Sequence, residues 1–151
     1  MWAGHVTNGA AAGALELGGG GGQNYTTLDF DQTTQEYASA PFIWRGCNQV
    51  TAEILWTCSA ATGPARWQVY LTTFAAGDDL SVIGGSAGSV TSSIGTADTL
   101  QRASVGVPLP TLPSGAIDGK FATVTLTRNT AHVADTLAGD ARFLGMYLTF
   151  K

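Results

Sequence analysis

The sequence has few charged residues: they make up 12% of its 151 positions, with 7 Lys plus Arg against 11 Asp plus Glu. The net charge of -4 leaves no basic footprint for nucleic acid. No run of about 18 apolar residues is present to span a membrane as a helix. The first ten residues, MWAGHVTNGA, lack the basic and apolar regions of a signal peptide. We therefore expect no nucleic-acid or membrane partner, and synthesis in a cytoplasm without export.

Cysteine and histidine are also scarce. Cys47 and Cys58 form no CxxC pair, and His5 and His132 lie at opposite ends of the chain. Zinc sites need several such ligands at short spacing, and neither an HExxH nor a Ser-His-Asp context is offered. We expect no metal, no cofactor and no catalytic histidine. The two cysteines are interpreted as reduced, partly buried small hydrophobes.

Small uncharged residues, mainly glycine, threonine and serine, are abundant where other proteins have charged residues. The chain has 20 glycines, few Lys, Glu or Gln residues, and many Thr, Val and aromatic residues, which suit pleated surfaces. This composition predicts an all-β protein, and the length is that of a single domain with one core. A surface with so little charge is tolerated best where neighbouring subunits cover it, so the composition also favours assembly.

Residues 1–23 predict an extended N-terminal arm, because the segment is weakly patterned and contains five consecutive glycines, Gly18 to Gly22. The Lys-Ser or Lys-Thr that follows a phosphate-binding glycine loop is absent. The arm is interpreted either as a linker or as a segment that becomes ordered against another subunit. Its apolar candidates for such an interface are Trp2, Val6, Leu15 and Leu17.

Residues 24–151 predict one β-sandwich domain with no helix longer than a turn or two. Pro41 cannot donate to a ladder, so its strand is expected at an edge, a bulge or a strand end. The segments 48–59 and 65–74 flank a Thr-Gly-Pro turn and are predicted to form a hairpin. About eight strands in this length fit two antiparallel sheets, most simply a jelly roll. The expected strands cover residues 28–30, 36–44, 48–59, 65–74, 89–94, 99–107, 120–128 and 141–150, with a weaker segment at 80–83.

The final stretch, 135–150, predicts a long central strand that closes the fold. Its even-numbered positions from 142 to 150 form a nearly continuous apolar stripe, which needs a core to cover it. Asp140 and Arg142 flank one residue at the strand start, so their side chains can leave the same face and pair. The alternative is a salt bridge from either residue to a neighbouring subunit.

The tryptophans and the paired carboxylates are the remaining candidates for a site. Trp44, Trp56 and Trp67 are interpreted as core residues, with Trp44, beside Arg45 at a strand end, as the best candidate for a surface or interface anchor. Two carboxylate pairs are close in sequence. The members of the first flank one strand residue, so both side chains can leave one face and hold a calcium ion or act as a glycosidase pair, whereas the second follows Gly77 and is expected to cap a short helical turn. A solvated strand face and a capped turn are the preferred interpretations. The pairs are Asp29 with Asp31 and Asp78 with Asp79.

Three segments carry a more specific pattern. They are LDFDQTTQEYA at 28–38, Gly-Asp-Asp-Leu at 77–80 and DTLAGDARFLGMYL at 135–148. The first and last resemble the two signature stretches of a family of small virion proteins of tailed phages and prophages. The middle segment is similar to the acidic turn of that family, in shortened form. Where relatives carry a Pro-Lys-Ser-Trp-like segment, this chain has Pro-Phe-Ile-Trp at 41–44, so it departs from the family there.

The resemblance implies a non-enzymatic structural component of a virus particle, on the head or on the tail, assembled in the cytoplasm of a bacterial host. Our first hypothesis is a capsid decoration or cement protein, a homotrimer that binds the major capsid protein or other virion proteins. The second is a tail, tail-fibre or head-fibre module that binds a host-surface glycan through Trp44 and loop carboxylates. The third, a glycan hydrolase, needs two of the four paired carboxylates to face one cleft.

Overall fold

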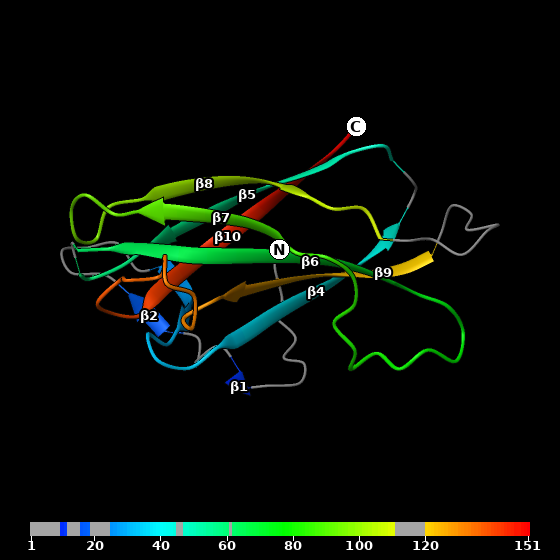
Figure 1. Ribbon diagram of the computed structural model, residues 1–151, viewed down its shortest axis with the longest axis horizontal. Coiled ribbons are helices and arrows are strands. Elements are labelled where there is room, and N and C mark those ends of the chain that lie inside the picture. The colour runs from blue at the N-terminus through cyan, green and yellow to red at the C-terminus, as the bar shows by residue number, and fades with distance from the viewer. Residues whose placement is uncertain (1–9, 12–15, 19–24, 45–46, 61, 111–119) are drawn as a thin grey trace.

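The computed structural model describes residues 10–11, 16–18, 25–44, 47–60, 62–110 and 120–151. Within these residues all regular secondary structure is β-strand, arranged in two stacked sheets whose long strands run along the length of the molecule (Figure 1). The all-β, jelly-roll-like antiparallel sandwich predicted from the sequence is confirmed. No described helix is long and apolar enough to cross a membrane.

Each sheet contains four long antiparallel strands and one short addition. In the first sheet the two-residue β1 pairs in parallel with β4, and in the second sheet β2 pairs with β3. The first sheet has the order β1 (Ala10–Ala11), β4 (Glu36–Trp44), β9 (Lys120–Arg128), β6 (Pro64–Phe74) and β7 (Gly88–Ser93). The second has the order β2 (Glu16–Gly18), β3 (Tyr25–Phe30), β10 (Ala141–Phe150), β5 (Val50–Thr57) and β8 (Gln101–Val107).

The core lies between the two sheets and is built from alternate residues of each strand. Trp56 of β5 and Trp67 of β6 are fully buried and meet edge to face across the sandwich, with ring centroids 5.7 Å apart. Phe30 packs against Trp67 in the same manner at 5.4 Å. Edge-to-face pairs add about 0.5–1.5 kcal/mol beyond the burial of their area. Both tryptophans are core residues, as predicted.

The predicted hairpin between residues 48–59 and 65–74 does not form. β5 lies in the second sheet and β6 in the first, so the Thr62-Gly63-Pro64 segment carries the chain from one sheet to the other. The two apolar stripes face each other across the core instead of lying side by side in one sheet. Alternation indicates only that each strand has one buried face. This is equally true of two strands in one hairpin and of two strands that face each other from different sheets.

The final strand is central, between β3 and β5, as predicted, but its apolar stripe changes parity along the strand. In the pairing with β5, Phe143 opposes Trp56 and Gly145 opposes Leu55, so Leu144 is the extra residue of a β-bulge. Before the bulge the odd-numbered side chains are buried; after it, the even-numbered ones turn inward. The prediction of one continuous even-numbered stripe is therefore wrong, because a bulge reverses the alternation.

Pro41 lies at an edge, as expected. β4 pairs with β9 from Tyr37 to Trp44, whereas its pairing with β1 covers Glu36 and Tyr37 among the described residues. Among the described strands, β9 is therefore the only neighbour at Pro41. Of the candidate interface residues, Trp2, Val6, Leu15 and Arg45 lie outside the described residues, and Leu17 is described only as part of the backbone of β2.

Candidate functional site

Arg128, at the end of β9, organises the corner where residues 28–38 meet residues 135–148. We call these two ranges the signature stretches. Its side chain is 1% exposed and forms a salt bridge with Asp135, whose side chain is 2% exposed. The guanidinium donates to both Asp135 oxygens over 2.8–3.2 Å. It also donates to the backbone carbonyls of Phe30, Leu137 and Gly139. A buried charge is tolerated only when it is paired and hydrogen-bonded in this way.

The contacts of Arg128 and Asp135 hold the connection between β9 and β10 against both sheets. Asp135 Oδ2 accepts a hydrogen bond from the backbone N–H of Arg66 at 2.8 Å, which ties the connection to β6. Gly63 allows a close approach at the same place, because it has a φ of 85° and a Cβ built on it would lie 2.2 Å from the Thr136 carbonyl oxygen. The loop that precedes the final strand is therefore fixed by specific polar contacts.

The acidic residues of the first signature stretch form the outer part of this corner. The Asp31 carboxylate accepts hydrogen bonds from the Thr33 hydroxyl and from the backbone N–H groups of Thr33 and Thr34, and these bonds lower the pKa of Asp31. Glu36 is buried and accepts the N–H of Asp31 at 2.6 Å. Burial raises the pKa of Glu36, and nearby carboxylates, including that of Asp140, raise it further. These carboxylates therefore shape the turn between β3 and β4.

Asp140 and Arg142 do not pair with each other, which corrects the prediction from their spacing. Asp140 accepts the backbone N–H of Gln32 at 3.1 Å. Arg142 binds Asp98 at 3.2 Å and lies 3.9 Å from Asp29, which stands opposite it on β3. Partners from the neighbouring strand and from the loop before β8 replace the expected local partner, because cross-strand neighbours lie closest on a sheet surface.

The charged side chains of both signature stretches are thus used in contacts within the chain. The central member of the network, Arg128, was not among the residues singled out from the sequence. One signal was present: Arg128 follows Ala122, Val124 and Leu126 at the inward parity of β9, and all three are buried. A charged residue in register with a core stripe indicates a buried ion pair, although the pattern does not identify its partner.

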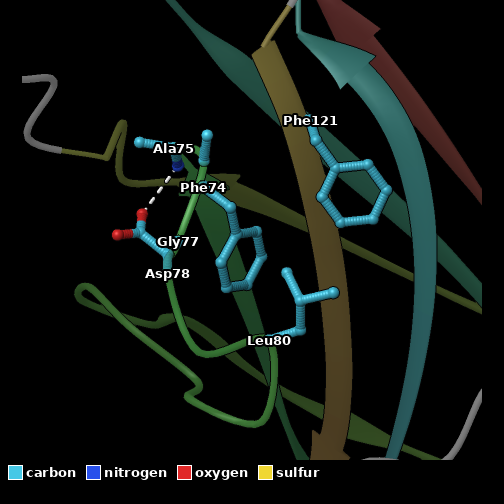
Figure 2. Close-up of a pocket in the computed structure, with 7 residues that line it drawn as sticks. Phe74, Ala75, Gly77, Asp78, Leu80 and Phe121 are labelled. Carbon is cyan, nitrogen blue, oxygen red and sulfur yellow. Dashed lines mark hydrogen bonds between the residues drawn. The ribbon is translucent and has the colours of Figure 1, made fainter.

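A second feature is an open hollow on the outer face of the first sheet, at the Phe74 end of β6. It has a volume of about 640 Å³. Phe121 of β9 stands between Phe74 and Ile43 in the sheet register, and the Phe74 and Phe121 rings lie 5.8 Å apart. Figure 2 shows these two rings with Leu80 beside them, a group that we call the aromatic hollow together with residues 75–78.

The acidic turn after β6 forms the other wall of the aromatic hollow. Asp78 Oδ2 accepts the backbone N–H of Ala75 at 2.6 Å, and Gly77 supplies the positive φ of 94° within this turn (Figure 2). Asp79 Oδ1 accepts the N–H of Ser81, and this bond lowers the pKa of Asp79. The Asp78-Asp79 pair caps turns, as expected, but the described residues there form no helical turn. Leu80, at the turn, is 55% exposed.

Trp44, the best candidate among the tryptophans for a surface or interface anchor, is only 2% exposed and lies in the core. Its ring packs against Phe42 at 6.3 Å and against Phe150 at 6.2 Å. Trp44 ends β4 at the inward parity, so strand alternation directs its ring between the sheets. A glycan platform on the outer surface of this chain therefore needs another aromatic residue, and Phe121, 39% exposed, is one.

Among the described residues, the remaining His and Cys candidates do not form a metal site. Within the described ranges, no three His, Cys, Asp or Glu side chains come together as a metal site. His132 lies exposed in the connection before β10, and its Nδ1 accepts the backbone N–H of Ala134. Cys47 and Cys58 are free thiols, and burial raises the pKa of Cys58.

Comparison with known proteins supports the fold. No protein-family model matches the chain, and no curated protein matches its sequence. Among solved structures, CBM35 from Cellvibrio japonicus Abf62 is similar with a TM-score of 0.52 and 13% identity, over 97% of this chain and 91% of that one. TmCBM61 in complex with beta-1,4-galactotriose is similar with a TM-score of 0.44 and 10% identity, over 87% and 73% of the two chains. At 13% identity, the similarity to CBM35 shows a common β-sandwich fold and nothing further.

Proposed function

We propose that the chain is a non-enzymatic structural protein of a bacteriophage virion, most specifically a capsid decoration or cement protein that binds the particle surface as an oligomer. The observation that carries the proposal is the resemblance of residues 28–38 and 135–148 to the signature stretches of small phage virion proteins. In the fold these two stretches adjoin through β3, β10 and the Arg128 network. The resemblance therefore lies in residues that specify the architecture.

The use of the signature charges supports a structural role over a catalytic one. A catalytic carboxylate pair needs both groups to face a substrate cleft. Asp29 lies beside Arg142 and accepts the Thr27 hydroxyl, while Asp31 caps its own turn. Asp78 and Asp79 hold the turn after β6. Each of the four carboxylates considered for hydrolysis therefore has a local structural role.

Co-sedimentation with phage particles tests the proposal. Purified protein is mixed separately with heads and with tails that lack it, and each mixture is sedimented. We expect retention on heads, saturating at a fixed number of copies per head. Retention on neither particle would overturn the virion assignment. Retention on tails alone would overturn the decoration role and leave the tail role.

The aromatic hollow favours a second candidate function, a tail or fibre module that binds a host-surface glycan. Apolar ring faces stack on the C–H face of a sugar, and a carboxylate at the rim accepts hydrogen bonds from its hydroxyl groups. Phe121 and Asp78 supply these two groups. CBM35, which has a similar fold, is a carbohydrate-binding module, and this agrees with the alternative at the level of fold only.

A glycan array followed by calorimetry tests this candidate. If it is correct, Phe121→Ala abolishes binding to the glycan selected on the array. The matched control is Tyr147→Ala, which removes another exposed aromatic ring from the second sheet. Equal binding by Phe121→Ala and the unmodified protein would exclude the aromatic hollow as the glycan site.

A further inference from the structure

The turn between β3 and β4 is held by carboxylates at four successive backbone positions. The N–H of Asp31 donates to Glu36 Oε2 at 2.6 Å, and the N–H of Gln32 donates to Asp140 Oδ1 at 3.1 Å. The N–H groups of the next two residues both donate to the Asp31 carboxylate. Hydrogen bonds to ionised acceptors are about twice as strong as those between neutral groups. Three carboxylates from different places in the chain therefore fix one turn.

Glu36 is the buried member of these three acceptors. It is 8% exposed and occupies the first position of β4. The charged groups that act on it are carboxylates: Asp31 in the turn, Asp140 in the connection before β10, and Asp29 on β3. Burial first, and these like charges after it, raise the pKa of Glu36 against the opposing effect of the Asp31 N–H. Ionised Glu36 is therefore poorly accommodated in the closed turn.

The two arginines of the corner are engaged with other carboxylates. Arg128 forms its salt bridge with Asp135, and Arg142 forms its salt bridges with two other aspartates. At the position of Glu36, β4 also pairs with β1, which consists of two alanines and carries no charge. Among the described residues, the environment of Glu36 thus combines several carboxylates with no cation in an ion pair to it.

Asp31 responds to pH in the opposite sense. The Thr33 hydroxyl, and then the backbone N–H groups that it binds, lower the pKa of Asp31 below the ordinary 3.8. Its contribution to stability is therefore complete above 3.8 and is lost as the pH falls through the lower folded value. The contribution of Glu36 is complete below the ordinary 4.5 and is lost as the pH rises through its raised folded value. Both contributions are complete only at mildly acidic pH.

We propose that the β3–β4 turn is a pH-sensitive latch, which is held most firmly at mildly acidic pH and opens more often as Glu36 ionises toward neutral pH. Opening returns water to the Glu36 carboxylate and separates it from its like-charged neighbours, so ionisation favours the open state. The latch joins β3 of one sheet to β4 of the other, and Asp140 ties it to the start of β10. The inference goes beyond the proposed function and does not depend on a virion role.

Hydrogen exchange of the backbone amides, measured by NMR and expressed as protection relative to the unfolded chain, tests the inference. We expect the protection of residues 31–34 to fall as the pH rises from about 4.5 to about 8. Glu36→Gln keeps an oxygen for the Asp31 N–H but cannot ionise, so the pH dependence is expected to disappear. The matched control, Glu53→Gln, removes the same charge from an exposed ion pair and is expected to retain the pH dependence.

Asp140→Asn tests the latch from a second position. It keeps an oxygen for the Gln32 N–H and removes one like charge that acts on Glu36, so we expect the loss of protection to move to lower pH. Circular dichroism establishes that each variant is folded, and Asp140→Asn decides the outcome if Glu36→Gln is not.

Four results would overturn the inference. They are constant protection of residues 31–34 over this pH range, an unchanged pH dependence in Glu36→Gln, an unchanged midpoint in Asp140→Asn, and turn amides that exchange only as fast as those of β5. The last result would show that the turn opens only when the whole domain unfolds.

Discussion

At the scale of single residues, Arg128 makes the most polar contacts of any described residue in the corner where residues 28–38 and 135–148 meet. Its guanidinium joins a carboxylate and three carbonyl oxygens that come from β3 and from the connection before β10. Removing one partner of a buried pair leaves the other charge uncompensated in a poorly solvated place. The stability of the corner therefore depends on Asp135 as much as on Arg128.

Asp135→Ala is expected to lower the free energy of unfolding by about 3–5 kcal/mol, the usual cost of breaking a buried ion pair. The matched control is Arg102→Ala, which removes an ion pair with Glu53 whose side chains are 67% and 39% exposed. The control is expected to cost at most about 1 kcal/mol. Urea denaturation measures both, and equal losses for the two variants would contradict the role given to Asp135.

Glu36 makes stability depend on pH. Its pKa in the folded protein is raised above the ordinary 4.5, first by burial and then by neighbouring carboxylates, against the lowering effect of the Asp31 N–H. A raised carboxyl pKa means that the folded state holds the proton more tightly, so ionisation of Glu36 reduces stability as the pH rises through the folded value. The contribution is complete below the unfolded value.

Glu36→Gln is therefore expected to raise the melting temperature at pH 7 and to lose this advantage as the pH falls below about 4.5. Gln retains an oxygen to accept the Asp31 N–H. Melting curves across this pH range make the test, with Glu53→Gln, on the exposed surface, as the control. A gain for Glu36→Gln that persists unchanged at acidic pH would show that ionisation is not its cause.

At the scale of elements, β7 and β8 approach closely, and of the two glycines at this contact only one has room for a side chain. A Cβ on Gly88 would meet the Gly106 carbonyl oxygen, whereas a Cβ on Gly106 would meet nothing within 4 Å. Gly88→Ala is expected to cost about 1–3 kcal/mol, typical of overpacking, because the two strands must separate. Gly106→Ala is expected to be tolerated. Thermal denaturation measures both variants, and equal melting temperatures for Gly88→Ala and Gly106→Ala would contradict this expectation.

The strands themselves were largely predictable, and their assembly was not. The predicted range 36–44 is the observed β4, and the ranges 99–107 and 120–128 match β8 and β9 to within two residues at each end. Alternation carries this information because each strand has one buried face. It does not report which sheet a strand joins, so β5 and β6 were placed in one hairpin. Alternation also does not reveal the bulge at Leu144, because no residue type there distinguishes a bulge from a regular strand.

The sequence singled out residues 28–38 and 135–148 but did not predict that they lie side by side, as β3 and β10 do in the structure. Arg142 pairs with Asp29 and Asp98 instead of Asp140, because pairing across a sheet depends on register. The aromatic hollow was also missed: Phe121 and Phe74 are 47 positions apart by their numbering and meet only because β9 and β6 are neighbours. Trp44 was the best candidate for a surface anchor among the tryptophans, but strand parity turns its ring inward.

At the scale of the whole molecule, the chain combines a well-connected corner with weakly charged, partly apolar surfaces. The corner fixes the sandwich, while the aromatic hollow and an apolar groove lined by β4 and β10 lie at the surface of the described residues. Exposed apolar patches of this kind mark contact surfaces in many proteins. A sandwich that presents two such surfaces and uses its signature charges internally suits a role in assembly.

The measurement that tests the virion assignment most directly is quantitative mass spectrometry of purified phage particles from a host that carries the gene for this chain. The account predicts that the chain is present in many copies per particle and that it remains with the heads when heads and tails are separated. Its absence from purified particles, in a host where the free protein is detected, would contradict the assignment.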